Sequence, residues 1–559
     1  MKRLSVLSLL MALTLIFSLL PLSASAETVD VTSLYKKKDV DDEWSAADAT
    51  VIDLNAVSDP QLTISRKGDY VLCGSYAGQV VIEAPEDAKV RLILNGADIV
   101  SPQGPAIYEK SADKLIVTLA TDTQNSLTDG PAVTDGDDTI GAALYAEDDL
   151  TLNGSGELAV SGTAKHGIQS KADLILAGGV ISVSAPVDGI RGRNSVLMLD
   201  GEIRVTAGGD GVVSTRTDKE GKGWIVLAGG SLTVTTGSGA GAVKASANSK
   251  GGERGGFGRG MAVQATAVSE VSQKAVKAAT DLTVLGGTYT FDCADDGLHA
   301  ANVTVSGGDF SIRSGDDGMH ADSELLITAG TIDITQCYEG VEGTNVTVTG
   351  GDLRIVASDD GVNASGGGSS GFDMRGGARF GGASSAMLTI SGGTLQVTAG
   401  GDGLDSNGSI AVTGGTVGVF AATTMGEGAI DFNGTGTISG GLLILASTGG
   451  MMSDMASLSG AQLISIPMNG TAGAGSEILV RGTSGSAAAS FAPQSAFTSL
   501  VIAGDGIAQG AQVSVSVNGS QLFSGAITAD MAAQGGAGFG GAGFGSGIGK
   551  GGGRNRKGW

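Results

Sequence analysis

The chain has 559 residues, of which 95 are glycine and only 4% are aromatic. Its 58 acidic and 34 basic residues give a formal net charge of −24. This balance argues against a nucleic-acid-binding protein, because such proteins present a basic face. The three cysteines are too few for a disulfide scaffold, so we expect three free thiols, Cys73, Cys293 and Cys337.

The N-terminal residues carry the features of an export signal. Lys2 and Arg3 precede an apolar run over residues 4–20, and Ala24-Ser25-Ala26 forms a cleavage site. Residues 1–26 are therefore predicted to be a signal peptide of a secreted or cell-surface protein, with no membrane span after cleavage. Residues 27–104, which include a charged stretch at 36–44, are interpreted as a linker and an N-terminal cap.

A short repeat with a nearly constant period organises residues 105–445. The acids Asp296, Asp317, Glu339 and Asp360 mark it, and they follow one another at almost equal intervals of about 22 residues. Each period holds two short alternating runs, separated by Gly-Gly and Asp-Asp-Gly turns in which glycine accepts positive φ. Such a period with no helical run predicts an all-β, single-stranded parallel β-helix, in which each strand pairs with its copy in the next coil at ~4.8 Å.

The regions that interrupt or follow the repeat differ in composition. Two Gly-rich insertions, 246–262 and 365–385, are expected to be disordered spacers, or alternatively flexible arms whose Phe and Arg residues stack on sugars. Residues 446–533 contain alternating runs that predict an antiparallel C-terminal β cap. The Gly-rich tail 534–559 is expected to be disordered, and its basic end offers a means of cell-surface association.

Stacking the periods would align their acids into a column. Unscreened carboxylates ~5 Å apart repel by roughly 1 kcal/mol in water, so the column requires protonation, basic partners or bound cations. Carboxylate oxygens are hard ligands that suit calcium. The predicted Ca²⁺ ligands are Asp295, Asp296, Asp316, Asp317, Glu339, Glu342, Asp359 and Asp360.

Two histidines share a second column beside the acids. His299 and His320 each lie two residues after a motif glycine, and Glu342 and Asn363 take that place in the next two coils. Such a row of hydrogen-bonding side chains could bind sugar hydroxyls. A zinc site is a weaker alternative because no cysteine lies near the two histidines, and ordinary polar strand residues are a third. The predicted substrate-binding residues are His299, His320, Arg313, Arg354 and Asn363, and no catalytic residue is assigned.

The cysteines provide a further expectation about side-chain direction. Cys293 lies three residues before its motif acid Asp296, whereas Cys337 lies two residues before Glu339. Successive residues of a strand point to opposite faces. We therefore expect these two thiols to face opposite sides.

Several motifs together resemble a bacterial family of exported carbohydrate-binding proteins. They are the Asp-Asp-Gly turns followed by Leu-His-Ala, Met-His-Ala or Val-Asn-Ala, and the segments YEGVEG, HGIQSKADL, VDGIRGRNSV and GEGAIDFNGTGTISGG. The resemblance runs from about residue 70 to about residue 519. It implies a right-handed parallel β-helix of pectate-lyase type that holds calcium and binds plant cell-wall polysaccharides such as polygalacturonate and cellulose. The acids that match the motif are Asp296, Asp317, Glu339, Glu342 and Asp360.

The pattern also departs from that family at several points. The motif acid is missing at Ala240 and Ala275, and the two Phe-Arg-Gly insertions are not part of the family pattern. We expect a secreted, calcium-dependent and non-catalytic protein that binds pectin or a cellulose-like polysaccharide. The alternatives are a calcium-dependent pectate lyase on the same scaffold, and a surface adhesin or matrix protein.

Overall fold

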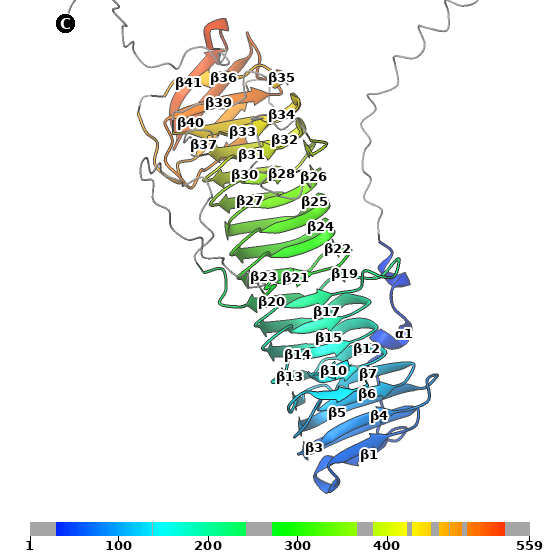
Figure 1. The fold of residues 1–559 in the computed structure, drawn as a ribbon. Helices are drawn as coiled ribbons and strands as arrows, with labels where there is room; N and C mark the ends of the chain where they lie inside the picture. Colours follow the sequence, from blue (N-terminus) through cyan, green and yellow to red (C-terminus); the bar gives the residue numbers. More distant parts are fainter. Residues whose placement is uncertain are drawn as a thin grey trace, which may run out of the picture.

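The computed structural model describes residues 29–136, 138–241, 271–365, 384–421, 428–448, 458–468, 470–482 and 489–531. The predicted signal peptide, the first Gly-rich insertion, all but the end residues of the second and the C-terminal tail lie outside these ranges. The described part is all-β, as the alternation predicts, and forms one long stack (Figure 1). Within the described residues no helix has the length and apolar character needed to cross a membrane.

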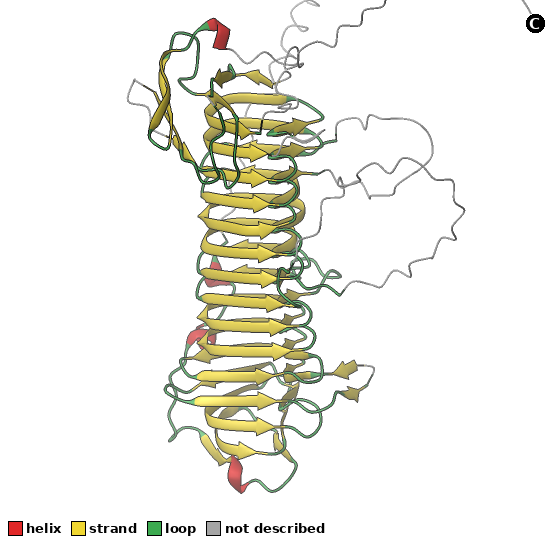
Figure 2. Cartoon of the chain, turned by 90° about the vertical axis from the view of Figure 1, so that its left-hand side faces the viewer, coloured by secondary structure: helices red, strands yellow, loops and turns green. Residues whose placement is uncertain are grey.

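Each coil of the stack has three sides, and every side is a row of parallel strands (Figure 2). The strands of the first side are β2 (Gln61–Ile64), β4 (Gln79–Glu83), β6 (Ile107–Ser111), β11 (Ala142–Ala146), β14 (His166–Ser170), β16 (Ile190–Gly192), β18 (Val212–Ser214), β21 (Val276–Lys277), β28 (Val362–Ala364), β31 (Leu404–Ser406) and β33 (Ile430–Phe432). The second side holds β1 (Thr50–Asp53), β3 (Gly68–Tyr76), β5 (Lys89–Val100), β7 (Lys114–Leu119), β12 (Asp149–Gly154), β19 (Trp224–Leu227), β22 (Asp281–Val284), β29 (Met387–Ile390) and β35 (Leu458–Gly460).

The third side and the corners complete each coil. The third side holds β8 (Gln124–Thr128), β13 (Glu157–Ser161), β20 (Ser231–Thr236), β23 (Thr288–Cys293), β27 (Asp352–Ala357) and β30 (Thr394–Ala399). Longer strands turn corners and serve two or three sides: β15 (Asp173–Ala185), β17 (Ser195–Ala207), β24 (Leu298–Ser314), β25 (Met319–Cys337), β26 (Val341–Val348), β32 (Ser409–Ala421) and β34 (Gly436–Ser447). The hairpin β9 (Val133–Asp135) and β10 (Asp138–Ile140) forms a separate two-stranded sheet, and its Ile140 packs against Tyr108 and Tyr145 of the first side.

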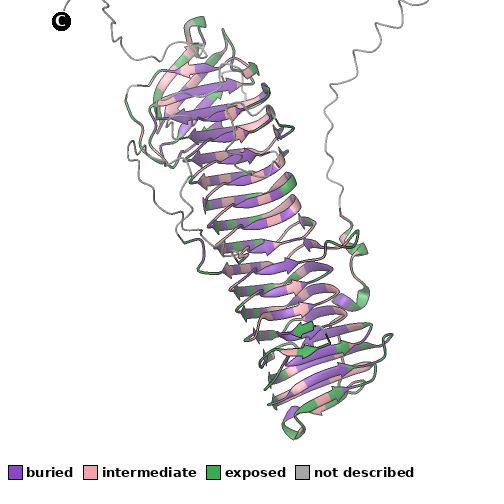
Figure 3. Ribbon diagram, viewed as in Figure 1, coloured by how far each residue is buried: buried purple, intermediate pink, exposed green. Residues whose placement is uncertain are grey.

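Alternation within the strands creates a continuous core inside the coils. In β24, for example, Leu298 and Ala300 are buried while His299 between them is partly exposed. One apolar cluster extends from Leu54 in the first coils to Ala503 near the end of the stack. Each coil buries its apolar face only against its neighbours, so the core accumulates along the stack (Figure 3).

The stack begins earlier than the expected boundary at residue 105, because β1 already pairs in parallel with β3 and β3 with β5. The preceding charged stretch is not a free linker. Its helix α1 (Lys37–Val40), between the 3₁₀ turns η1 (Val31–Ser33) and η2 (Leu54–Ala56), lies against the second side of the stack (Figure 1). The buried carboxylate of Asp39 accepts hydrogen bonds from Lys114 Nζ at 2.7 Å and Thr151 Oγ1 at 2.9 Å. These bonds fasten the segment to strands β7 and β12.

Antiparallel strands follow the last coils. Strand β39 (Ser499–Gly504) pairs antiparallel with β34 and with β36 (Ile464–Ile466). A separate antiparallel sheet contains β38 (Ala489–Phe491), β37 (Ile478–Gly482), β40 (Gln512–Val517) and β41 (Ser520–Ala526), followed by the 3₁₀ turn η4 (Ala529–Met531). Its core packs on the outer face of the third side in the last coils, with Phe491 beside Gly418 of β32. This region covers strands whose apolar faces would otherwise meet water.

All three cysteines are free, as predicted, but the opposite orientation expected for Cys293 and Cys337 is wrong. Both thiols are buried inside the coils. The register between β24 and β25 shifts after Ile312, and that between β25 and β27 shifts after Ile334. The additional residue bulges out of the strand and returns Cys337 to the inner face.

Candidate functional site

The acid at the turn of each coil belongs to a ladder of backbone hydrogen bonds. The N–H groups of Gly297 and Gly318 donate to the carbonyl oxygens of Asp317 and Glu339, each at 2.9 Å. The Asp317 N–H also donates to the side-chain Oδ1 of Asp296 at 3.1 Å. The structure therefore places Asp296, Asp317 and Glu339 in consecutive coils on one side of the molecule.

The glycine after each acid is required by close approach of the coils. A Cβ on Gly318 would lie 2.5 Å from the carbonyl oxygen of Gly340, and one on Gly297 would lie 2.5 Å from that of Gly318. None of these motif glycines has positive φ, so the conformational reason expected from the sequence is wrong here. Positive φ occurs instead in the Gly-Gly turns, for example at Gly308 with φ 97°.

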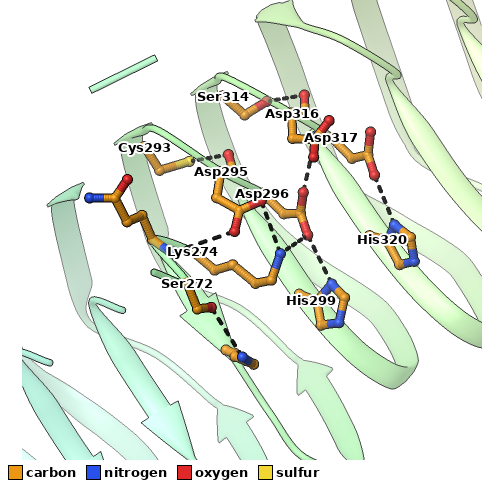
Figure 4. A network of polar contacts seen from close by, with 12 residues as sticks. Ser272, Lys274, Cys293, Asp295, Asp296, His299, Ser314, Asp316, Asp317 and His320 are labelled. Atoms are coloured by element: carbon orange, nitrogen blue, oxygen red, sulfur yellow. Dashed lines mark hydrogen bonds and ion pairs between the residues drawn. The ribbon is translucent and has the colours of Figure 1, made fainter. Parts of the chain in front are cut away.

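A lysine takes the place of the acid in the coil before Asp296. Strand register pairs Val276 with Leu298, which sets Lys274 opposite Asp296. Its ammonium lies 3.0 Å from Asp295 Oδ1 and also contacts Asp296 Oδ2 (Figure 4). Burial opposes ionisation of Asp296, but the partners His299 and Lys274 outweigh it and lower the pKa of this carboxyl. The sequence-based assignment of the missing acid to Ala275 is wrong, because Ala275 lies opposite Gly297, and Lys274, one repeat before Asp296, was missed.

The two histidines lie directly beside the acid ladder. The Nδ1 atoms of His299 and His320 are each 2.8 Å from a carboxylate oxygen, of Asp296 and Asp317 respectively (Figure 4). The rings stack with centroids 4.8 Å apart. Burial alone would lower the pKa of His320, but hydrogen bonds to Asp317 and Glu342 raise it to about 11. The structure thus brings the predicted His column and acid column together.

The coils beyond His320 hold more acid than their bases balance. Burial, with the charges of Asp296 and Glu342, raises the pKa of Asp317 to about 7. Burial and the charges of Glu342 and Asp317 raise that of Glu339 to about 9. Burial also disfavours the Glu342 carboxylate, but hydrogen bonds from His320 and Ser365 outweigh it and lower its pKa. Negative charge is therefore crowded around Asp317 and Glu339.

Asn363 lies at the centre of this crowded region. Its Nδ2 donates to Glu339 Oε2 at 2.9 Å, while its Oδ1 is buried without a hydrogen-bond partner. The residue is 8% exposed. A buried amide oxygen with no donor costs free energy unless a ligand or water satisfies it.

A row of cross-strand neighbours runs along the first side and changes character along the stack. Strand register places in this row Gln169, Arg191, Val213, Lys277, His299, His320, Glu342, Asn363, Asp405 and Asp431. Its charged members are basic before the histidines and acidic after them. Asp405 and Asp431 were missed, although Asp405 follows the motif acid Asp402 by the same three residues that separate His299 from Asp296.

The remaining predicted residues are distributed between the ladder and the third side. Asp295 and Asp316 form a group with Asp296 whose oxygens all lie within 4.8 Å of one another. Asp359 stacks on its neighbouring coil by donating its N–H to the Tyr338 carbonyl oxygen at 3.0 Å.

Arg313 and Arg354 are not brought to the histidine row. They lie on the third side, where their guanidinium groups are 3.4 and 2.8 Å from Asp292 and Asp333. Both pairs are substantially exposed to solvent.

The first side offers two further groups of ligand atoms. Asp317, His320 and Glu342 form one, and Asp402, Asp405 and Asp431 form the other, each with its ligand atoms within 4.8 Å of one another. The group of three aspartates suits calcium, which takes roughly six to eight oxygens at about 2.3–2.6 Å from carboxylates, amide carbonyls and water. In the other group only the two carboxylates do so, because imidazole nitrogen is not a calcium ligand. The group around Asp296 is less suited, because the Lys274 ammonium already occupies it.

The fold is that of a stacked β protein whose first side carries a row of charged and amide side chains. A family model described as carbohydrate-binding domain-containing protein matches residues 58–318 and 318–517, and the chain belongs to this family. A carbohydrate-binding domain-containing protein of Acetivibrio thermocellus is 32% identical over 138 residues, which cover 24% of this chain and 48% of that protein. The chain therefore spans about half the length of this relative.

One solved structure is also similar. It is the gadolinium derivative of a polysaccharide lyase-like protein from C. thermocellum, which is 23% identical with a TM-score of 0.36. The match covers 50% of this chain and 96% of the solved chain.

Proposed function

We propose that this protein is a secreted, calcium-dependent carbohydrate-binding protein built on a right-handed parallel β-helix. Its target is an acidic or β-linked cell-wall polysaccharide, such as polygalacturonate or a cellulose-like glycan, which it binds without cleavage. Membership of the carbohydrate-binding domain family supports the glycan partner. Right-handed winding is supported by the strong preference of parallel β crossovers for that hand.

The acid-rich end of the first side is the observation on which the proposal rests. Around Glu339 the charges of Asp317 and Glu342 are close, and the raised pKa of Glu339 reports an electrostatic cost. The buried Oδ1 of Asn363 supplies an amide oxygen that has no hydrogen-bond donor. Carboxylates together with an amide oxygen match calcium chemistry, and a bound Ca²⁺ would offset both features.

Calcium also explains how an acidic protein could bind an acidic polymer. The formal net charge of −24 repels a uronate chain at a distance. A divalent cation held by the partly exposed Glu342 and the buried amide oxygen of Asn363 would present positive charge to the carboxylate of a sugar. Neutral β-linked glycans would instead use hydrogen bonds to the side chains of this row.

A retention experiment with matched variants tests the proposal. We expect full-length protein to be retained on insoluble polygalacturonate or cellulose in the presence of Ca²⁺ and released by chelator. Glu342→Gln should weaken retention by about tenfold or more, since truncating one partner of a buried charge pair costs about 2–5 kcal/mol. The control Glu324→Gln makes the same change at an exposed glutamate of the neighbouring strand β25.

Three outcomes would each contradict a different part of the proposal. Retention that is unaffected by chelator would remove calcium from it. Equal losses in both variants would remove the acidic row as the binding face. If an unsaturated sugar product, measured by its ultraviolet absorbance, formed at alkaline pH with calcium, the protein would be a lyase.

A further inference from the structure

We propose that His299, His320 and Asp322 form a binding site for a transition-metal ion of the zinc type. This site uses the Nε2 atoms of the two rings, whereas the Nδ1 atom of His320 faces the proposed calcium ligand Glu342, and it does not rest on the carbohydrate-binding function. From the sequence, two histidines without a cysteine are a poor zinc signature. The structure adds a carboxylate, Asp322, that the sequence analysis did not single out.

The histidines are held in the orientation that metal ligands require. In each ring Nδ1 faces a carboxylate that is almost fully buried, Asp296 at 3% and Asp317 at 8% side-chain exposure. A carboxylate accepts the Nδ1 proton, which fixes the tautomer and leaves Nε2 available to a metal. Histidine ligands of metal sites are commonly oriented by such a carboxylate.

Both Nε2 atoms face one oxygen of Asp322. Its Oδ1 lies 3.8 Å from His299 Nε2 and 3.7 Å from His320 Nε2. These distances are too long for hydrogen bonds. Two ligands bound to a tetrahedral zinc ion at about 2.0–2.1 Å lie about 3.3 Å apart. The two distances from Asp322 are only slightly longer than this separation, so a small rotation of the Asp322 side chain would let it share an ion with either ring.

Asp322 owes its position to an irregularity of the coil. The register between β24 and β25 shifts between Ala300 and Asn302, and that between β25 and β26 shifts between Ala321 and Glu324. This coil therefore has an additional residue at the corner after His320, and such bulges re-aim side chains. The Asp322 side chain is 64% exposed, so it can move towards an ion while the histidines stay held.

The chemistry of the three ligands favours zinc over calcium. Imidazole nitrogen is a preferred ligand for zinc, copper and nickel, whereas calcium takes oxygen. Two histidines and one carboxylate leave a fourth position for water, as in open zinc sites. The carboxylates of Asp296, Asp317 and Glu342 around the rings also favour a dication, which would release a proton from His320 to solvent on binding.

Zinc titration of the full-length protein tests the site. The sequence holds only three histidines, so His166→Gln is a matched control for His299→Gln and His320→Gln. By calorimetry in excess Ca²⁺ we expect one equivalent of Zn²⁺ to bind to the wild type and to His166→Gln. Each of the other two variants should bind it at least about tenfold more weakly, because even loss of an outer-shell partner costs about 10–100-fold. Asp322→Asn should fall between them and the wild type.

A spectroscopic measurement keeps the proposal testable if a variant does not fold. With Cu²⁺ as the probe, electron paramagnetic resonance of the wild type should show coupling to two imidazole nitrogens. A spectrum with none or one would overturn the proposal. So would Zn²⁺ binding that survives in both His299→Gln and His320→Gln, that disappears in His166→Gln, or that excess Ca²⁺ abolishes.

Discussion

The first side of the stack uses one backbone turn in two electrostatic ways. Before the histidines, each acid has a strong base close by. Asp188 lies 2.7 Å from an Arg191 guanidinium nitrogen, and Lys274 sits between Asp295 and Asp296. We call this stretch, residues 188–296 of the first side, the basic-partnered half.

After His320 the turn is the same but the partners change. Glu342 has an imidazole at 3.0 Å and Glu339 has an amide at 2.9 Å. We call residues 317–431 of the first side the acid-rich half. The hydrogen-bond ladder fixes the acids in both halves. The pKa of Asp296 is lowered because His299 and Lys274 outweigh its burial, whereas burial and neighbouring acids raise those of Asp317 and Glu339. A repeat fold can therefore give its acids strong bases in some coils and weaker partners in others.

Removing Lys274 should make the basic-partnered half resemble the acid-rich half. We expect this change to have the largest effect on stability. Lys274 is 12% exposed and its partner Asp296 is 3% exposed. Lys274→Met would leave Asp295 and Asp296 without their ammonium, at a cost of about 3–5 kcal/mol for breaking a buried pair. Urea unfolding should show this loss without metal, and Ca²⁺ should restore more stability to the variant than it adds to the wild type.

The control for this change is Lys277→Met in the same coil. Its ammonium is more exposed and lies 3.8 Å from Asp210, so we expect a loss below about 1 kcal/mol. Equal losses in the two lysine variants would contradict the special role of Lys274. If Ca²⁺ restored stability to neither variant, the two halves would differ only in the ion pairs that their acids make.

A buried carboxyl group can also be stabilised by protonation instead of by a basic partner. Glu109 tests this alternative, and we expect its effect on stability to be intermediate in size. This residue of β6 is fully buried, and its Oε2 accepts the Asp148 N–H at 3.0 Å. Burial raises its pKa from the ordinary 4.5 to about 7. The folded state therefore binds the proton more tightly, and the stability that Glu109 contributes below pH 4.5 is lost as pH rises through 7.

Glu109→Gln should remove that pH dependence. The difference between 4.5 and about 7 corresponds to up to about 3 kcal/mol, at roughly 1.4 kcal/mol per pKa unit. We expect the variant to exceed the wild type in stability by up to this amount at pH 8 and to equal it near pH 4.5, measured by urea unfolding at both. The exposed Glu83→Gln on β4 should change little at either pH. A variant that is less stable than the wild type at pH 8 would mean that the Glu109 charge is stabilised.

The smallest effect is expected on the third side, where charges are paired in solvent. Arg354 and Asp333 are 42% and 41% exposed. Arg354→Ala should change stability by no more than about 0.5 kcal/mol, because exposed ion pairs contribute little. It should also leave retention on polygalacturonate unchanged. A clear loss of retention would show that Arg354 belongs to the binding surface, as the sequence predicted.

The sequence predicts the repeat more fully than it predicts the site. The nearly constant spacing of the acids was enough to stack Asp296, Asp317 and Glu339. It could not show the bulge that turns Cys337 inward, because a local addition and deletion cancel within one period. The sequence also did not show that the corner after Ala321 holds an additional residue, so Asp322 looked like an ordinary corner residue.

Partners across an insertion were also beyond sequence reasoning. Lys274 is distant from Asp210 along the chain, since residues 242–270 lie between them. Only the pairing of Val212 with Val276 shows that the two coils are adjacent. Likewise nothing in the charged N-terminal stretch indicated that Asp39 would meet Lys114 on the second side.

The amino-acid sequence by itself determined the all-β class, the period and the acids that recur with it, because those follow from local alternation and turn chemistry. The tertiary structure alone decided which base, amide or imidazole each acid meets. That choice depends on register between coils, where one added residue or one long insertion changes the neighbour without changing the pattern. Two charged side chains compensate each other when they are close in space, and their spacing along the chain does not show whether they are.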